Sequence, residues 1–137
     1  MLIHATCVSI GGRAVLITGP SGGGKSDLAL RLIDRGALLV SDDQVKLSAD
    51  GGVLYASAPA TIGGRMEIRG IGIVEAPHAG PTPVALRVDL MLPVERMPEP
   101  ASCDYCGIDV PLAALHPFEA SAPLKVERAL DRWGLAL

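Results

Sequence analysis

The chain has 137 residues, 49% of them hydrophobic, and a formal net charge of -3 with acidic and basic side chains interspersed. This length suits one buried core, so we expect residues 1–137 to form a single domain. The sequence has no basic stripe that would neutralise phosphates, so a nucleic-acid partner is not expected. No apolar run approaches the ~20 residues of a membrane span, and the first residues do not resemble a signal peptide. These features predict a soluble, cytoplasmic protein.

The first predicted element is a β-hairpin from Ile3 to Ile17. Apolar residues alternate with polar ones at its start, and Gly11-Gly12 then provides a turn before an apolar stretch. A histidine in such a strand, here His4, ordinarily has a structural role.

A glycine-rich stretch follows that satisfies GxxxxGK[ST] at every fixed position: Gly19, Pro20, Ser21, Gly22, Gly23, Gly24, Lys25 and Ser26. In such a loop, backbone N–H groups wrap around a nucleotide β-phosphate, and the N-terminus of the next helix adds partial positive charge. Lys25, expected on an exposed loop, would reach the phosphate oxygens, and the Ser26 hydroxyl would ligate Mg²⁺. The apolar strand before the stretch and the helix after it favour a P-loop over a plain glycine-rich turn.

A helix and a buried strand are predicted after this loop. Apolar residues from Ser26 to Arg35 share one face, and Gly36 suits a C-terminal cap. Ala37 to Val40 is a continuous apolar run that is typical of a buried strand. The order of strand, loop, helix and strand from Ala14 to Val40 indicates a crossover that lays the two strands parallel.

Two adjacent acids, Asp42 and Asp43, follow the second of these strands. Parallel strands end at the same edge of a sheet, so both carboxylates are expected beside the γ-phosphate. Because successive side chains at a strand end point to opposite sides, one acid would face the phosphates and the other would serve structure or metal. Taken alone, the pair also suits a turn cap.

The remaining sequence predicts strands, surface connections and a final helix. A hairpin joins Val45–Leu47 to Val53–Ala56, Val84–Leu92 is a strand, and Ile108–Leu112 is a short strand interrupted by Pro111. Proline-rich surface connections are expected at Pro77–Pro83 and Pro93–Ser102, and Ser121 would cap a helix that docks through Val126, Leu130 and Trp133. The predicted fold class is therefore α/β, a P-loop nucleotide-binding domain with a mixed β-sheet, a central P-loop helix and a C-terminal helix.

The cysteines allow two interpretations. Cys103 and Cys106 form a CxxC pair, which is half of a four-ligand zinc set, and His116 is the nearest further candidate. Thiols on an exposed loop are the simpler interpretation.

Three stretches carry a family resemblance: Ile3-His4-Ala5-Thr6, GPSGGGKSDLALRLIDRGALLVSDDQV from Gly19 to Val45, and MEIRGIGI from Met66 to Ile73. In this order and spacing they resemble the catalytic domain of HPr kinase/phosphorylase, a bacterial P-loop enzyme. The match covers about Ile3 to Val74 and resembles a short form that comprises the catalytic C-terminal domain. The resemblance implies an ATP-dependent serine kinase that phosphorylates the phosphocarrier protein HPr of the phosphotransferase system.

The resemblance also assigns roles. Gly19 to Ser26 would bind ATP, with Lys25 on its phosphates, and Ser26 and Glu67 would hold Mg²⁺. Asp43 would accept the proton of the target serine.

His4 would lie beside the transferring phosphoryl group, and Arg69 would stabilise charge or the signature segment. Arg96 is a weaker match to a further functional arginine. Glu67 and Arg69 are expected on alternating positions of one strand, directed into the site, with Gly70 and Gly72 allowing close approach.

The family's reverse reaction, in which inorganic phosphate removes phosphate from phospho-HPr, is associated with an arginine-containing loop. The corresponding segment here, Leu115 to Pro123, has no arginine, so the kinase activity is the expected one. Two other classes stay open: a P-loop NTPase or small-metabolite kinase, and a non-catalytic nucleotide-dependent binding module. A homo-oligomer is also open.

Overall fold

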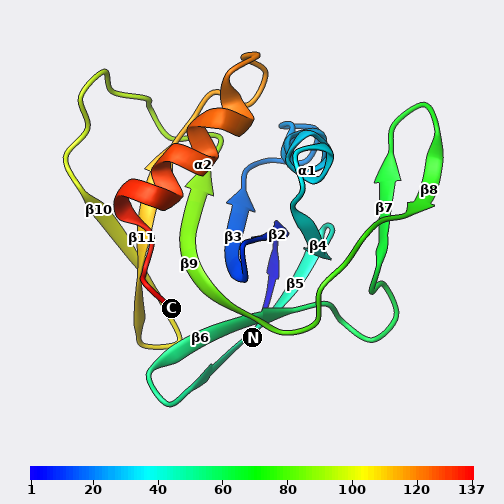
Figure 1. Cartoon of the computed structure of the whole chain (residues 1–137), viewed down its shortest axis with the longest axis horizontal. Helices are drawn as coiled ribbons and strands as arrows, with labels where there is room; N and C mark the ends of the chain where they lie inside the picture. Colours follow the sequence, from blue (N-terminus) through cyan, green and yellow to red (C-terminus); the bar gives the residue numbers. More distant parts are fainter.

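The computed structural model describes all residues, 1–137, and shows a mixed, curled β-sheet with two helices on one side (Figure 1). The main sheet runs in the order β1 (Leu2–His4), β5 (Gln44–Asp50), β6 (Val53–Ser57), β9 (Thr82–Asp89), β3 (Arg13–Thr18), β2 (Thr6–Ile10) and β4 (Leu38–Ser41). β11 (Ile108–Ala114) also pairs with β9, and β10 (Ala101–Tyr105) pairs with β11. A separate two-stranded sheet contains β7 (Arg65–Ile68) and β8 (Gly72–Glu75).

The central strands have the directions that the crossover requires. β3 is parallel to β9 and antiparallel to β2, and β2 is in turn antiparallel to β4. β3 and β4 therefore run in the same direction, as predicted, but β2 lies between them. The predicted mixture of strand directions is confirmed.

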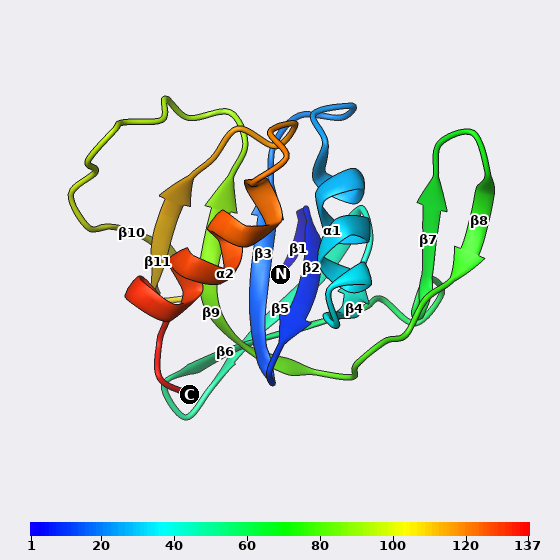
Figure 2. The same cartoon turned by 45° about the horizontal axis from the view of Figure 1, so that its top comes forward.

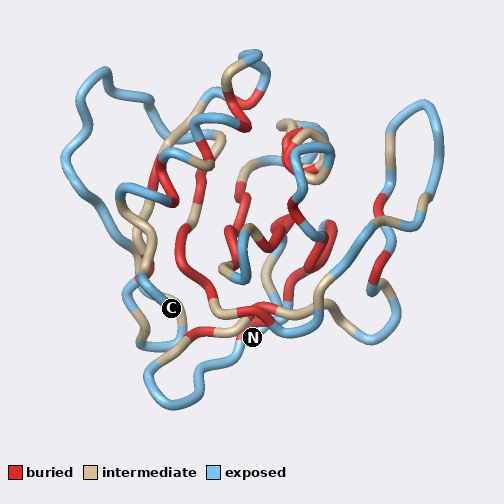
Figure 3. The backbone as a smooth tube through the Cα atoms, in the orientation of Figure 1, coloured by how far each residue is buried: buried red, intermediate tan, exposed pale blue.

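The core has two parts because β3 is buried on both faces (Figure 3). Val15 and Ile17 face the helices α1 (Lys25–Asp34) and α2 (Ala122–Trp133), whereas Ala14 and Leu16 face the layer of β5 and β6. Side chains alternate along a strand, so one strand contributes to both clusters. The glycine-rich segment that follows β3 (Figure 2) therefore starts from a strand that is buried on both faces.

The helices lie close to their predicted bounds. α1 begins at Lys25 rather than Ser26, and Gly36 follows its end with a φ of 107°, as a C-terminal glycine does. In α2, Val126 and Leu130 are buried, which confirms the docking face, but the Ser121 side chain makes no capping hydrogen bond. Neither helix is long and apolar enough to cross a membrane.

The N-terminal region contains one more strand than the predicted hairpin. The extended segment is interrupted at Ala5, so β1 is separate from the β2–β3 hairpin and pairs with β5 instead. β2 is buried on both faces instead of alternating, because α1 covers one face and the layer of β5 and β6 covers the other.

The expectation for Pro111 was wrong. Pro111 does not interrupt its strand: it pairs with Ser102, and pairing with β9 begins one residue later, so no hydrogen bond to β9 needs its missing N–H. The predicted surface connection Pro77–Pro83 is largely confirmed, since residues 77–81 are exposed or half-buried and β9 begins at Thr82. The Pro77 carbonyl and the Ala79 N–H both bond to Leu39 of β4. The Pro93–Ser102 connection is exposed through residue 100, and β10 begins at Ala101.

The EIRGIGI segment forms a hairpin, not one strand. Arg69 lies in the turn between β7 and β8, and the hairpin extends away from the main sheet (Figures 1 and 2). Gly70 and Gly72 have φ values of 88° and 116°, and a Cβ on either would meet nothing within 4 Å. At both positions the positive φ is a backbone conformation that favours glycine.

Candidate active site

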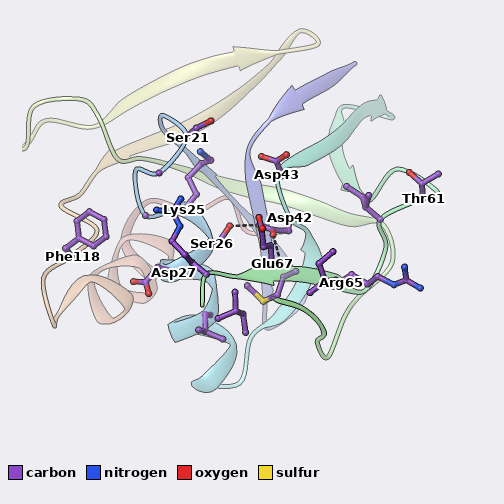
Figure 4. A pocket seen from close by; sticks show the side chains of 18 residues that line it. Ser21, Lys25, Ser26, Asp27, Asp42, Asp43, Thr61, Arg65, Glu67 and Phe118 are labelled. Atoms are coloured by element: carbon purple, nitrogen blue, oxygen red, sulfur yellow. Dashed lines mark hydrogen bonds between the residues drawn. The ribbon is translucent and has the colours of Figure 1, made fainter. Parts of the chain in front are cut away.

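A cavity of about 800 Å³ lies between the glycine-rich loop, the end of β4 and the β7–β8 hairpin (Figure 4). Its lining includes most of the predicted site: Ser21, Gly22, Gly24, Lys25, Ser26, Asp43, Glu67 and Arg69. It also includes Asp42, the first acid of the predicted pair, and residues that the sequence did not single out, among them Asp27, Arg65 and Phe118.

Glycine is required at two loop positions for different reasons. A Cβ on Gly23 would lie 2.8 Å from the Pro20 carbonyl oxygen, and the Gly23 N–H donates to that same oxygen at 2.9 Å. Gly24 has a φ of 97°, a conformation that other residues rarely adopt, immediately before α1. These constraints turn the chain sharply between β3 and the helix.

Lys25 is buried, not on an exposed loop as expected. It is 6% exposed, and its Nζ donates to the carbonyl oxygens of Gly19 at 3.0 Å and Pro20 at 2.9 Å. The ammonium group therefore lies inside the loop and holds its two ends together.

Asp42 is the polar centre of the cavity. Its Oδ1 accepts a hydrogen bond from Ser26 Oγ at 2.7 Å, and its Oδ2 accepts one from the Glu67 backbone N–H at 3.2 Å (Figure 4). Oδ1 also accepts from Thr6 Oγ1 at 3.1 Å. One buried carboxylate thus joins β2, α1 and β7. The sequence offered Asp42 only as half of a pair.

Asp43 also lines the cavity, so both acids of the pair reach the same site. Asp43 has a φ of 70°, so the regular alternation of an extended strand does not apply to it. Its carboxylate is 71% exposed, and Oδ1 lies 3.3 Å from Nδ1 of His4. His4 reaches the site through this contact and does not itself line the cavity.

The hairpin brings Glu67 beside Asp42 (Figure 4), whereas Arg96 is not among the residues that line the cavity. Met66 is 2% exposed and holds the base of the hairpin against the body, while Glu67 and Arg69 are exposed side chains in the cavity wall. Arg96 is in the exposed connection between β9 and β10 and does not line the cavity.

A second carboxylate, Asp89, stands at the end of β9, beside the end of β3. Its oxygens accept from the Thr18 hydroxyl, from Arg87 and from the backbone N–H groups of Met91 and Leu92, at 2.8 to 3.0 Å. Burial by itself would raise the pKa of Asp89, but these donors hold the pKa below its ordinary value. This network fixes the strand end from which the glycine-rich loop departs.

The cysteines lie apart from this site. Cys103 is in β10 and half-buried rather than on a loop, Cys106 is exposed at the following turn, and no group of three or more His, Cys, Asp or Glu side chains is placed to hold a metal. Burial raises the pKa of Cys7 far above its ordinary value, which leaves that thiol unreactive.

Comparison with known proteins identifies the family. The family described as HPr Serine kinase C-terminal domain matches residues 1–105. The chain belongs to this family. It is 40% identical over 111 residues to HPr kinase/phosphorylase of Alkaliphilus metalliredigens, covering 78% of this chain and 36% of that protein. It is 36% identical over 135 residues to HPr kinase/phosphorylase 1 of Oceanobacillus iheyensis, covering 93% of this chain and 44% of that protein.

The fold agrees with this membership. The solved structure of the Hpr(Ser) kinase/phosphatase from Coxiella burnetii superposes with a TM-score of 0.85 at 31% identity, covering 96% of this chain and 94% of that chain. The chain spans about a third to under half of the length of these two curated relatives.

Proposed function

We propose that residues 1–137 act as a P-loop protein kinase domain that transfers the γ-phosphoryl group of ATP to a serine of an HPr-type phosphocarrier protein. The observation that carries the proposal is the meeting of three elements at one cavity. The glycine-rich loop, the Asp42–Asp43 strand end and the hairpin with Glu67 all line it. Family membership and the names of the relatives favour the same activity.

In this proposal the phosphates of ATP lie along the glycine-rich loop, from Gly19 to Ser26. Lys25 already lies within the loop, where its ammonium group has three N–H donors. These can exchange their hydrogen bonds to the carbonyl oxygens of Gly19 and Pro20 for hydrogen bonds to phosphate oxygens. The N-terminus of α1 adds its partial positive charge at the same point.

The oxygen donors around Ser26 fit Mg²⁺. The Ser26 hydroxyl donates a hydrogen bond to Asp42, so the lone pairs of the Ser26 oxygen stay free to ligate a cation. Glu67 lies next to the Asp42 carboxylate. Mg²⁺ commonly binds through one or two carboxylates plus substrate phosphates, so three protein ligands are not needed. When bound, the ion would offset negative charge on the phosphates, with Ser26 and Glu67 as the residues that hold it.

Asp43 is the proposed base for the serine hydroxyl. Asp42 is buried and engaged by three donors, whereas Asp43 is exposed enough for a protein substrate to reach it. The serine oxygen forms a bond to the γ-phosphorus, the bond to the β–γ bridging oxygen breaks, and ADP leaves. The serine proton passes to the Asp43 carboxylate, which His4 keeps oriented.

Arg69, in the hairpin turn, is proposed to balance negative charge on the transferring phosphoryl group. The reverse reaction is not part of this proposal, because residues Leu115 to Pro123 contain no arginine. Phosphoserine-HPr incubated with the protein and inorganic phosphate is expected to yield no pyrophosphate.

The proposal is tested by incubating the protein with ATP labelled at the γ-phosphate, Mg²⁺ and the HPr of the same organism. Label is expected in a phosphoserine of HPr, and Lys25→Ala is expected to reduce its transfer by about 10²-fold or more. The matched control is Lys46→Ala, which removes an exposed lysine on β5 outside the cavity. ATP hydrolysis that HPr does not affect, with no label in HPr, would favour a plain NTPase instead.

A further inference from the structure

The chain's single phenylalanine, Phe118, lies in the cavity and has no role in the phosphoryl transfer described above. We propose that the Phe118 ring is the platform on which the nucleobase of the bound nucleoside triphosphate stacks, and that Arg31 positions it. The inference rests on the proposed function, since it assigns the base-binding end of the same site. Phe118 lies beyond residues 1–105, so the family match does not include it.

The position of Phe118 fits the base end of a nucleotide. In Figure 4, Lys25 and Ser26 lie between Phe118 on one side and Asp42 and Asp43 on the other. The loop that carries Phe118 follows β11, which joins the sheet on the β9 side of β3, whereas the acids follow β4 on the β2 side. A triphosphate on the loop with its γ end at the acids therefore directs its nucleoside toward Phe118.

The ring lies directly against the glycine-rich loop. A Cβ on Gly24 would lie 3.0 Å from the ring carbon Cζ and 3.1 Å from the Cβ of Pro117. A buried aromatic ring would stabilise the fold strongly, but Phe118 is 71% exposed and contributes little to the core. A planar ligand covering this face would remove apolar surface from water.

The backbone around the ring is held in place while the ring stays exposed. Arg31 of α1 donates to the carbonyl oxygens of Pro117 and Glu119, the residues on either side of Phe118. Asp27 holds the Arg31 guanidinium at 2.9 Å. A platform that is already ordered binds its ligand with a smaller loss of conformational entropy.

Stacking recognises the face of a base and not its edge, because every base has a π-face. The inference therefore predicts modest discrimination between ATP and GTP. An alternative use of an exposed ring is contact with the protein substrate, and the experiment below separates the two.

The test compares binding of ATP and of tripolyphosphate, both with Mg²⁺, by calorimetry. Phe118→Ala is expected to weaken ATP binding by about tenfold or more and to leave tripolyphosphate binding unchanged within about twofold. Phe118→Trp should restore ATP binding. The control, Met97→Ala, removes an exposed apolar side chain outside the cavity and should change neither affinity.

Arg31→Met tests the positioning role in a double-mutant cycle. It should weaken ATP binding in the wild-type background and have little further effect in Phe118→Ala, because both changes remove the same platform. Additive losses would refute the role of Arg31.

Two outcomes overturn the stacking proposal: unchanged ATP affinity in Phe118→Ala, or an equal loss of ATP and tripolyphosphate affinity. Unchanged ATP affinity with a raised KM for HPr would mean that the ring contacts the protein substrate. An equal loss of both affinities would mean that the ring supports the glycine-rich loop. A wild-type protein that binds no ATP would refute this proposal and the proposed function together. ATP binding that depends on Phe118, without transfer to HPr, would support stacking and refute only the kinase proposal.

Discussion

The glycine-rich loop and the β7–β8 hairpin line the same cavity, but the fold holds them in different ways. The loop lies between β3 and α1, and Lys25 and Leu28 at its helical end are buried. The hairpin forms a small sheet of its own, held at its base by Met66 and by the Glu67 N–H bond to Asp42, while Ile71 near its turn is 73% exposed. Changes in the loop should therefore affect both stability and activity, and changes in the hairpin mainly activity.

The largest effect that would sharpen this contrast is on stability. Leu32→Ala, in the core between α1 and the sheet, should lower the free energy of unfolding by about 2–5 kcal/mol, because it leaves a cavity. Ile71→Ala, a similar truncation on the hairpin, should change it by less than about 0.5 kcal/mol. Denaturant unfolding followed by circular dichroism measures both. Equal losses would mean that the hairpin is part of the cooperative core.

A smaller effect concerns the metal. Glu67→Gln keeps the backbone bond to Asp42 but removes a charged oxygen donor, so the Mg²⁺ concentration for half-maximal activity should rise about tenfold. Activity should recover at high Mg²⁺, and the free energy of unfolding should not change. Glu75→Gln, on the paired strand of the hairpin and outside the cavity, is the control. A wild-type Mg²⁺ titration in Glu67→Gln would remove this residue from the metal site.

The smallest effect is the loss of stability at low pH that Asp89 causes, beside the strand end from which the glycine-rich loop departs. The pKa of Asp89 is lowered in the folded protein, so its contribution to stability is present above the unfolded carboxyl pKa of about 4 and is lost as pH falls through the folded pKa. Below about pH 4 the wild-type protein should lose stability more steeply than Asp89→Asn, by at most about 1.4 kcal/mol per pH unit. Unfolding curves at several pH values give both slopes, and parallel slopes would contradict the depressed pKa.

The sequence predicted the loop and its surroundings well because their spacing is fixed by local chemistry. A strand, a turn that requires glycine, a helix and a second strand leave little freedom, so Lys25, Ser26 and the acids were found together. The orientation of the acids was not predictable, because the φ of 70° at Asp43 breaks the alternation of a strand.

The hairpin and Phe118 were missed for different reasons. The stretch from Met66 to Ile73 alternates like a strand, and only the positive φ of Gly70 shows that it turns back on itself. Phe118 stands in a loop with no local pattern, and its contact with Gly24 depends on how β11 and α1 are placed. Such long-range contacts are set by topology and not by neighbouring residues.

The most direct test of the proposed mechanism is single-turnover phosphorylation of HPr by Asp43→Asn, with ATP affinity measured beside it. The Asp43 carboxylate is exposed, and its one side-chain partner is His4, so this variant should keep its fold and ATP affinity. Its transfer rate should fall by about 10²-fold or more, since the amide cannot accept the serine proton. The matched variant Asp42→Asn should instead lose stability and Mg²⁺ affinity, because three donors depend on that carboxylate. A wild-type transfer rate in Asp43→Asn would contradict the account.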